Sequence, residues 1–146
     1  MQVTLSVIGK LRDPALKSLF DEYKKRLDWK ITLHEFEAKA SSLKEGELLL
    51  KSLPPATFMI ILDEKGENLK SEEFAELLKN IQIHHQGKVG FVVGGPDGLD
   101  DEVKTKAQKS LSFGRMTWPH LLVRVMLMEQ LYRAQQILKN HPYHRE

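Results

Sequence analysis

The chain has 146 residues, which is the size of one domain and enough to bury a substantial core. Its 41% hydrophobic and 29% charged residues are ordinary for a soluble globular protein. The sequence contains no cysteine, which excludes disulfides, thiolate zinc sites and cysteine nucleophiles.

The first residues do not resemble a targeting signal. They lack a basic stretch and a small-residue cleavage site, so we expect no signal peptide. No uncharged run approaches the ~20 residues needed to cross a bilayer. We therefore expect a cytoplasmic enzyme or binding protein without a membrane partner.

The net charge of +2 hides an uneven distribution. Residues 1–103 carry 14 Lys and Arg against 18 Asp and Glu, whereas residues 104–146 carry 8 against 2. A basic C-terminal segment suggests an anionic partner such as RNA. A solvated helix face rich in lysine explains the same excess about equally well.

The first segments alternate between strand and helix patterns. Residues 2–8 are β-branched and apolar and predict a strand. Asp13 and Pro14 fit the N-cap and first residue of a helix, with apolar positions at helical spacing after them. Residues 31–36 predict a second strand.

The second helix is predicted over residues 41–53, and we expect its Glu45 and Glu47 to be solvent-exposed charges. The continuous apolar run 57–62 then predicts a central parallel strand that is covered on both faces. We expect this strand to end in a polar turn at residues 63–66.

The next segments repeat the alternation. Ser71 is expected to cap a helix, and residues 89–93 predict a buried strand that ends at Gly94. Residues 100–109 predict a short helix, followed by a short strand at residues 110–113.

The last helix is predicted over residues 119–139, and its apolar residues cover more than one stripe. Since a surface helix needs only one apolar face, we expect a homodimer that packs partly through this helix. Glu129 and Arg133 stand at i and i+4 in the favourable order and are expected to pair.

This alternation predicts a single α/β domain over residues 1–146, with a mostly parallel sheet and helices on both faces. Ligands bind such sheets at the carboxyl ends of the strands. Three loops should therefore share one rim: Leu62 with Asp63, Gly94 with Gly95, and residues 113–118.

The glycine turn at residues 94–98 has two interpretations. It can simply supply the backbone angles of a turn, or it can let the backbone approach an adenosine closely. No Gly-Lys-Ser/Thr follows it, and it does not match the dinucleotide-binding fingerprint.

The histidines do not suggest a metal site. His84 and His85 are adjacent, whereas metal ligands on a helix prefer i,i+4 spacing, so we expect surface histidines. His120 is expected to cap the last helix or to pack at its start. The end of the chain places an aromatic ring, an imidazole and a guanidinium together, which suits stacking on bases and phosphate binding.

Several segments together resemble the RlmH family, bacterial methyltransferases of the SPOUT class that act on a pseudouridine of 23S rRNA. They are the glycine turn at 94–98, residues 111–117 with Pro119 and His120, residues 129–134 and residues 141–144. The resemblance covers the whole chain. It implies a SPOUT-type α/β trefoil knot in the C-terminal third.

The resemblance also implies S-adenosyl-L-methionine in the three rim loops, held mainly by backbone and apolar groups. The implied cofactor contacts are Leu62, Gly95, Phe113, Gly114, Arg115, Met116, Thr117 and Trp118. Gly114 departs from the family, in which serine is frequent, so we expect backbone binding there. No metal is implied.

For the reaction, the resemblance implies methylation of pseudouridine N3 in 23S rRNA on the assembled ribosome. It also implies a homodimer in which the C-terminal tail, residues 143–145, completes the partner's site. Since the N3 proton must leave, His144 is the first candidate for general base. Arg145 would hold phosphate or the deprotonated ring, and Tyr143 would stack on or position the base.

Two other classes of protein stay open. One is an α/β enzyme that uses another nucleotide cofactor, such as a reductase. The other is a non-catalytic RNA-binding module, which would bind RNA without binding S-adenosylmethionine.

Overall fold

The structure is a computed structural model that describes residues 1–39 and 41–145. Its strands form one parallel sheet in the order β2-β1-β4-β3-β5. The strands are β1 (Gln2–Ile8), β2 (Lys30–Phe36), β3 (Phe58–Asn68), β4 (Lys88–Val93) and β5 (Lys109–Ser112). The helices are α1 (Pro14–Arg26), α2 (Ser42–Lys51), α3 (Ser71–His84), α4 (Asp101–Lys106) and α5 (His120–Leu138), followed by the 3₁₀ turn η1 (Pro142–Arg145).

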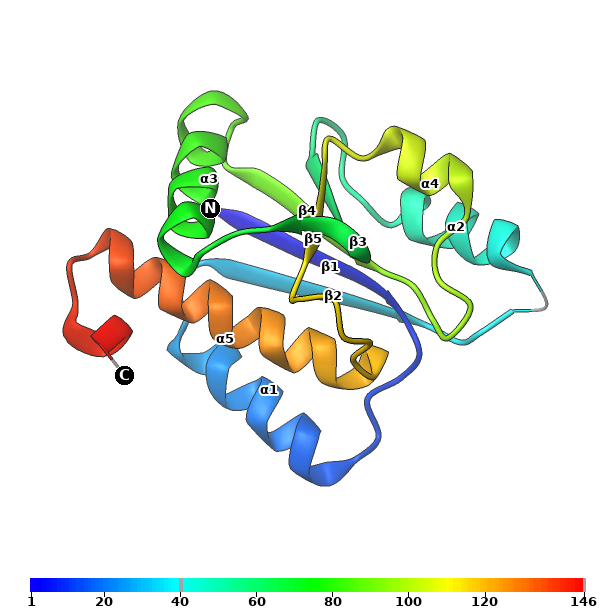
Figure 1. Ribbon diagram of the computed structural model, residues 1–146, viewed down its shortest axis with the longest axis horizontal. Helices are drawn as coiled ribbons and strands as arrows, with labels where there is room; N and C mark the ends of the chain where they lie inside the picture. Colours follow the sequence, from blue (N-terminus) through cyan, green and yellow to red (C-terminus); the bar gives the residue numbers. More distant parts are fainter. Residues whose placement is uncertain (40, 146) are drawn as a thin grey trace.

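Helices cover both faces of this sheet (Figure 1). On one face, α5 packs against α1 and α3; on the other, α2 packs against α4. The predicted α/β class with a parallel sheet is confirmed.

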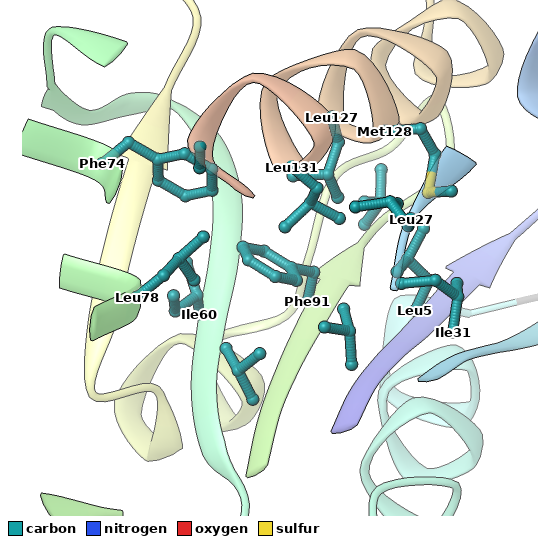
Figure 2. Packing of buried hydrophobic residues seen from close by; sticks show 14 of the residues in the cluster. Leu5, Leu27, Ile31, Ile60, Phe74, Leu78, Phe91, Leu127, Met128 and Leu131 are labelled. Atoms are coloured by element: carbon teal, nitrogen blue, oxygen red, sulfur yellow. The ribbon is translucent and has the colours of Figure 1, made fainter. Parts of the chain in front are cut away.

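The larger core lies between the sheet and the α1, α3 and α5 layer (Figure 2). Phe91 of β4 is completely buried there, and its ring centroid lies 6.1 Å from that of Phe74 on α3. Leu127 and Leu131 of α5 are also completely buried. Burying such side chains stabilises the fold by about 1.5–3 kcal/mol each relative to exposure.

The predicted helix starts are confirmed for α1 and differ slightly for α3. The Asp13 carboxylate accepts from the Ala15 and Leu16 amides, as an N-cap does. Ser71, expected to cap α3, is instead its first residue, and the N-cap is Lys70. The Glu73 carboxylate accepts from the Lys70 amide, so the helix start is held from inside the helix.

The expectation that Glu45 faces solvent is wrong, although Glu47 is exposed. Glu45 is buried, and its carboxylate accepts from the backbone amide of Lys39 at 2.9 Å. The Glu45 carboxylate therefore anchors the backbone at Lys39, just before α2. Helical spacing alone cannot show this contact.

Strand β3 continues beyond the apolar run, so the polar turn expected at residues 63–66 is wrong. Leu111 of β5 pairs with Leu62 and again with Glu67, because the register shifts between these two residues. A Cβ on Gly66 would lie 2.6 Å from the backbone of Leu111, so only glycine allows this approach. The trefoil knot itself stays a prediction.

The last helix matches its predicted length closely, and the Glu129–Arg133 ion pair is present at 2.6 Å. Much of the second apolar face of α5 is covered by α1 and α3 of the same chain. Leu122 and Met126 are half-buried. Among the described residues, no helix is both long and apolar enough to cross a membrane.

Candidate functional site

A cavity of about 790 Å³ opens at the carboxyl edge of the sheet. The ends of β3, β4 and β5 and the start of α5 supply its walls, so the three predicted loops do share one rim. Residues from the predicted set that line it are Leu62, Gly95, Phe113, Gly114, Met116, Thr117 and Trp118. Arg115 is exposed and is not among the lining residues.

Gly94 and Gly95 of the turn after β4 are packed too closely to their neighbours for a side chain. A Cβ on Gly94 would lie 2.8 Å from the backbone of Gly98, and one on Gly95 would lie 3.0 Å from the Ile8 side chain. The Gly98 amide also donates to the Gly95 carbonyl. The turn therefore brings bare backbone to the cavity wall, which suits hydrogen bonding to a ligand by peptide groups.

Polar contacts join the loops around the cavity. Thr117 donates to Glu64 at 3.0 Å, and this bond links the segment before α5 to the extension of β3. Lys104 of α4 pairs with Asp63 at 3.5 Å. These contacts link β3 to α4 and to the segment before α5.

His120, the first residue of α5, lines the cavity, and we did not predict it as a site residue. Its ring packs against Gly9, where the positive φ of 95° and the lack of a Cβ make room for it. Burial, and then the charge of Arg124, lowers the pKa of His120. The cavity therefore carries an imidazole that is biased toward its neutral form. The sequence signal that could have identified His120 is its position directly after Pro119 at the start of a predicted helix.

Arg124 lies one turn further along α5 and is completely buried. It donates to Glu35 of β2 at 2.8 Å and to the Ile8 carbonyl at 3.1 Å. Glu35 also accepts from the Leu11 amide at 2.7 Å. This network ties the start of α5 to the ends of β1 and β2 behind the cavity.

The tail forms a second cluster of polar residues, centred on Glu129 of α5. One oxygen of Glu129 accepts from Arg133 and from the Tyr143 hydroxyl, the latter at 3.2 Å. The Tyr143 ring stacks edge-on against Tyr132 at 4.8 Å and lies beneath the Arg133 guanidinium at 5.0 Å. Burial, and then Tyr23, raises the pKa of Tyr143, so its hydroxyl stays protonated as a donor.

His144 belongs to the same cluster. Its Nε2 lies 2.8 Å from a carboxylate oxygen of Glu72, and its Nδ1 lies 3.4 Å from Nη1 of Arg133. The hydrogen bond with His144 is the main cause that lowers the pKa of Glu72. Arg145, next in the chain, is exposed.

The tail does not meet the cavity of its own chain. Glu129 follows His120 by nine residues on α5, which is about 14 Å along the helix and two and a half turns. The tail cluster therefore lies on the side of α5 opposite His120. The structure brings the predicted cofactor residues together, and separately the predicted catalytic residues Tyr143, His144 and Arg145.

A metal is not suggested by either cluster. Across residues 1–39 and 41–145, no group of three or more His, Asp or Glu is arranged to hold an ion.

The comparison with known protein families decides the class of the protein. The family described as "Predicted SPOUT methyltransferase" matches residues 1–144. The chain belongs to the SPOUT methyltransferase family. The resemblance seen in the glycine turn and the tail is thereby confirmed, and the protein is a methyltransferase of the SPOUT class.

Relatives of this SPOUT methyltransferase match over their full length. A protein of Rhodospirillum centenum named "Ribosomal RNA large subunit methyltransferase H" is 47% identical, with 99% of each chain covered. A protein of the same name from Carboxydothermus hydrogenoformans is 40% identical over 99% of this chain and 100% of its own.

A solved structure shows the same fold. It is described as a probable methylase family protein from Haemophilus influenzae Rd KW20, and it is similar to this SPOUT methyltransferase with a TM-score of 0.59 at 14% identity. The match covers 96% of this chain and 69% of the other. At that identity the likeness concerns the fold alone.

Proposed function

We propose that the protein methylates 23S rRNA in the large ribosomal subunit, with S-adenosyl-L-methionine as donor and N3 of a pseudouridine as acceptor. The observation that carries the proposal is the glycine-walled cavity at the carboxyl edge, in a chain whose full-length relatives are named for large-subunit ribosomal RNA. Residues 1–146 act as one domain, in the cytoplasm, on the assembled ribosome.

The cavity has the chemistry that this donor requires. Leu62, Leu111 and Phe113 offer apolar surface for an adenine ring, and the turn at Gly94 and Gly95 offers peptide groups for hydrogen bonds. Asp63, Glu64 and Asp97 line the cavity together with Lys65 and Lys104, so the lining offers charges of both signs to a donor that carries a sulfonium, an ammonium and a carboxylate. When bound, the donor supplies an electrophilic methyl group, and the cavity's task is to orient it.

The other cofactor contacts follow from the loop before α5. Gly114 binds through its backbone, and Met116, Thr117 and Trp118 border the cavity opening. Arg115 is exposed and is not among the lining residues, so we assign its contact to the outer end of the ligand or to RNA.

We assign binding of the acceptor base to the tail. The N3 proton of the base must leave before or during methyl transfer, so a base or a stabilised anion is needed. Tyr143 positions the base, Arg145 holds phosphate or the anionic ring, and His144 is the first candidate for the proton. The exposed Arg145 is free to reach RNA.

A homodimer would bring the cavity of one chain together with the tail of the other. Since residues 143–145 do not line the cavity of their own chain, we assign their action to the cavity of a second copy. Half-buried Leu122 and Met126, together with exposed Leu19 on α1, offer apolar surface for that copy.

The test is transfer of labelled methyl groups from S-adenosylmethionine to ribosomes from a strain that lacks the modification. We expect one methyl group per large subunit, on the pseudouridine. A folded dimer that incorporates no label would exclude the proposed activity. RNA binding without donor binding would instead support an RNA-binding module, and tight binding of another nucleotide would support a different enzyme.

A further inference from the structure

His144 is held by side chains from two other elements of its own chain. Glu72 stands in the first turn of α3, and Arg133 lies near the end of α5. The two groups face opposite nitrogens of the imidazole, Nε2 at 2.8 Å and Nδ1 at 3.4 Å. The position and the rotation of the ring are therefore both determined by its neighbours.

These neighbours also favour one tautomer of the neutral imidazole. An arginine has only donors, so a hydrogen bond with Arg133 requires Nδ1 of His144 to accept, which favours the Nε2–H tautomer of the neutral ring. The proton of a neutral imidazole then sits on Nε2 and is donated to Glu72. In this arrangement neither nitrogen has a free lone pair for a proton from the substrate.

The carboxylate of Glu72 has the His144 imidazole as its main partner, ahead of its own backbone amide. It is exposed, and the helix start is held by Glu73, which accepts from the Lys70 amide. The neighbouring Ser71 donates to Gln130, which in turn donates to Glu129. The first turn of α3 therefore reaches the tail twice, through Glu72 directly and through the Gln130–Glu129 chain.

We infer that Glu72 is a positioning residue for the tail, which anchors the Nε2–H of His144 so that His144 orients the acceptor and does not remove its proton. The inference rests on the proposed function for its catalytic consequence. It assigns a task to α3, an element that contributes nothing to the cavity. It also replaces the general-base role considered first for His144 with orientation of the acceptor, so the N3 proton leaves to solvent and Arg145 stabilises the anionic ring.

The experiment uses the full chain with Glu72→Ala, Glu72→Gln and, as a matched control, Glu76→Ala one turn along α3, where the carboxylate is also exposed. Long-range ¹H–¹⁵N spectra of the free protein, with His144→Asn for assignment, report the tautomer of His144. We expect the Nε2–H tautomer in the wild type, its loss in Glu72→Ala, and its retention in Glu72→Gln, whose carbonyl still accepts.

Methyl transfer is measured on the same variants. We expect kcat to fall about tenfold or more in Glu72→Ala because the imidazole is no longer held in place, with KM for the donor unchanged. Glu72→Gln should recover most of the rate, and Glu76→Ala should match the wild type. A purely structural role would change stability or KM without this recovery.

Two results would overturn the inference. One is an Nδ1–H tautomer in the wild type, or a His144 spectrum that does not respond to Glu72→Ala. The other is a kcat that stays the same or rises in Glu72→Ala, since a rise would show that Glu72 restrains the tail. The spectra need no activity, so a wild type without methyl transfer but with the Nε2–H tautomer would overturn the proposed function and leave the anchoring contact established.

Discussion

The guanidinium of Arg124 donates to the carboxylate of Glu35 at 2.8 Å from a side chain that has no exposed surface. Burial lowers the pKa of Arg124, and the charge of Glu35 opposes this shift. The Nε of Arg124 has no hydrogen-bond partner among the described residues. The buried positive charge of Arg124 is therefore stabilised by one carboxylate, that of Glu35, and by one carbonyl, that of Ile8.

Glu35→Ala should lower the free energy of unfolding by about 3 kcal/mol, because it leaves a buried charge without its partner. Urea denaturation measures this. The control is Glu37→Ala, an exposed carboxylate 3.7 Å from Lys10 and from Arg12, which should change stability by less than about 1 kcal/mol. Equal losses would mean that the buried position of the pair does not matter.

Gly66→Ala should destabilise the protein by about 2 kcal/mol or more, because its Cβ would meet the Leu111 backbone at 2.6 Å and backbone cannot rotate away. Thermal or urea unfolding gives the difference. Lys65→Ala, the exposed neighbour, serves as the control. An unchanged stability of Gly66→Ala would show that the backbones of β3 and β5 do not lie this close together.

Trp118 should report ligand binding by its fluorescence, since it lines the cavity and is 41% exposed. Trp29, the other tryptophan, precedes β2 at the opposite edge of the sheet. In Trp29→Phe, saturation with S-adenosylhomocysteine should change the emission, and in Trp118→Phe it should not. If the emission changes in Trp118→Phe and not in Trp29→Phe, the ligand binds elsewhere.

Deletion of residues 143–146 should abolish methyl transfer and leave donor binding largely intact, because residues 143–145 do not line the cavity of their own chain. Transfer is followed with labelled donor, and binding by calorimetry. If both are lost equally, the tail supports the fold and has no separate role in the reaction.

Acidification should destabilise the protein through His120. Burial and Arg124 lower its pKa below the ordinary 6.5, so between the lowered pKa and 6.5 the unfolded chain binds more protons than the folded one. The free energy of unfolding therefore rises with pH in this window. His120→Asn should flatten the rise in urea midpoints measured across it, whereas His84→Asn, at an exposed site on α3, should not.

The sequence predicted what depends on local pattern. Period-2 and period-3.6 patterns located the strands and helices, Asp13 marked a helix start, and the carboxyl-end rule grouped Leu62 with Gly95. The chemistry of the loops and tail came from the family resemblance.

The remaining features depend on contacts between distant residues. Glu45 looked like a surface charge because its partner is a loop amide, and β3 continues through polar residues because β5 pairs with them. Glu72 meets a histidine 72 residues further along the chain. Spacing within one helix cannot reveal a partner that tertiary folding supplies.

The placement of the tail behind α5 has a consequence for mixtures of defective proteins. If each working site combines the cavity of one copy with the tail of another, a copy without its tail still offers a cavity, and a copy with a blocked cavity still offers a tail. Two inactive preparations, exchanged into mixed pairs, would then regain activity. Upon dilution, this activity would fall faster than the protein concentration, because the working unit is the pair.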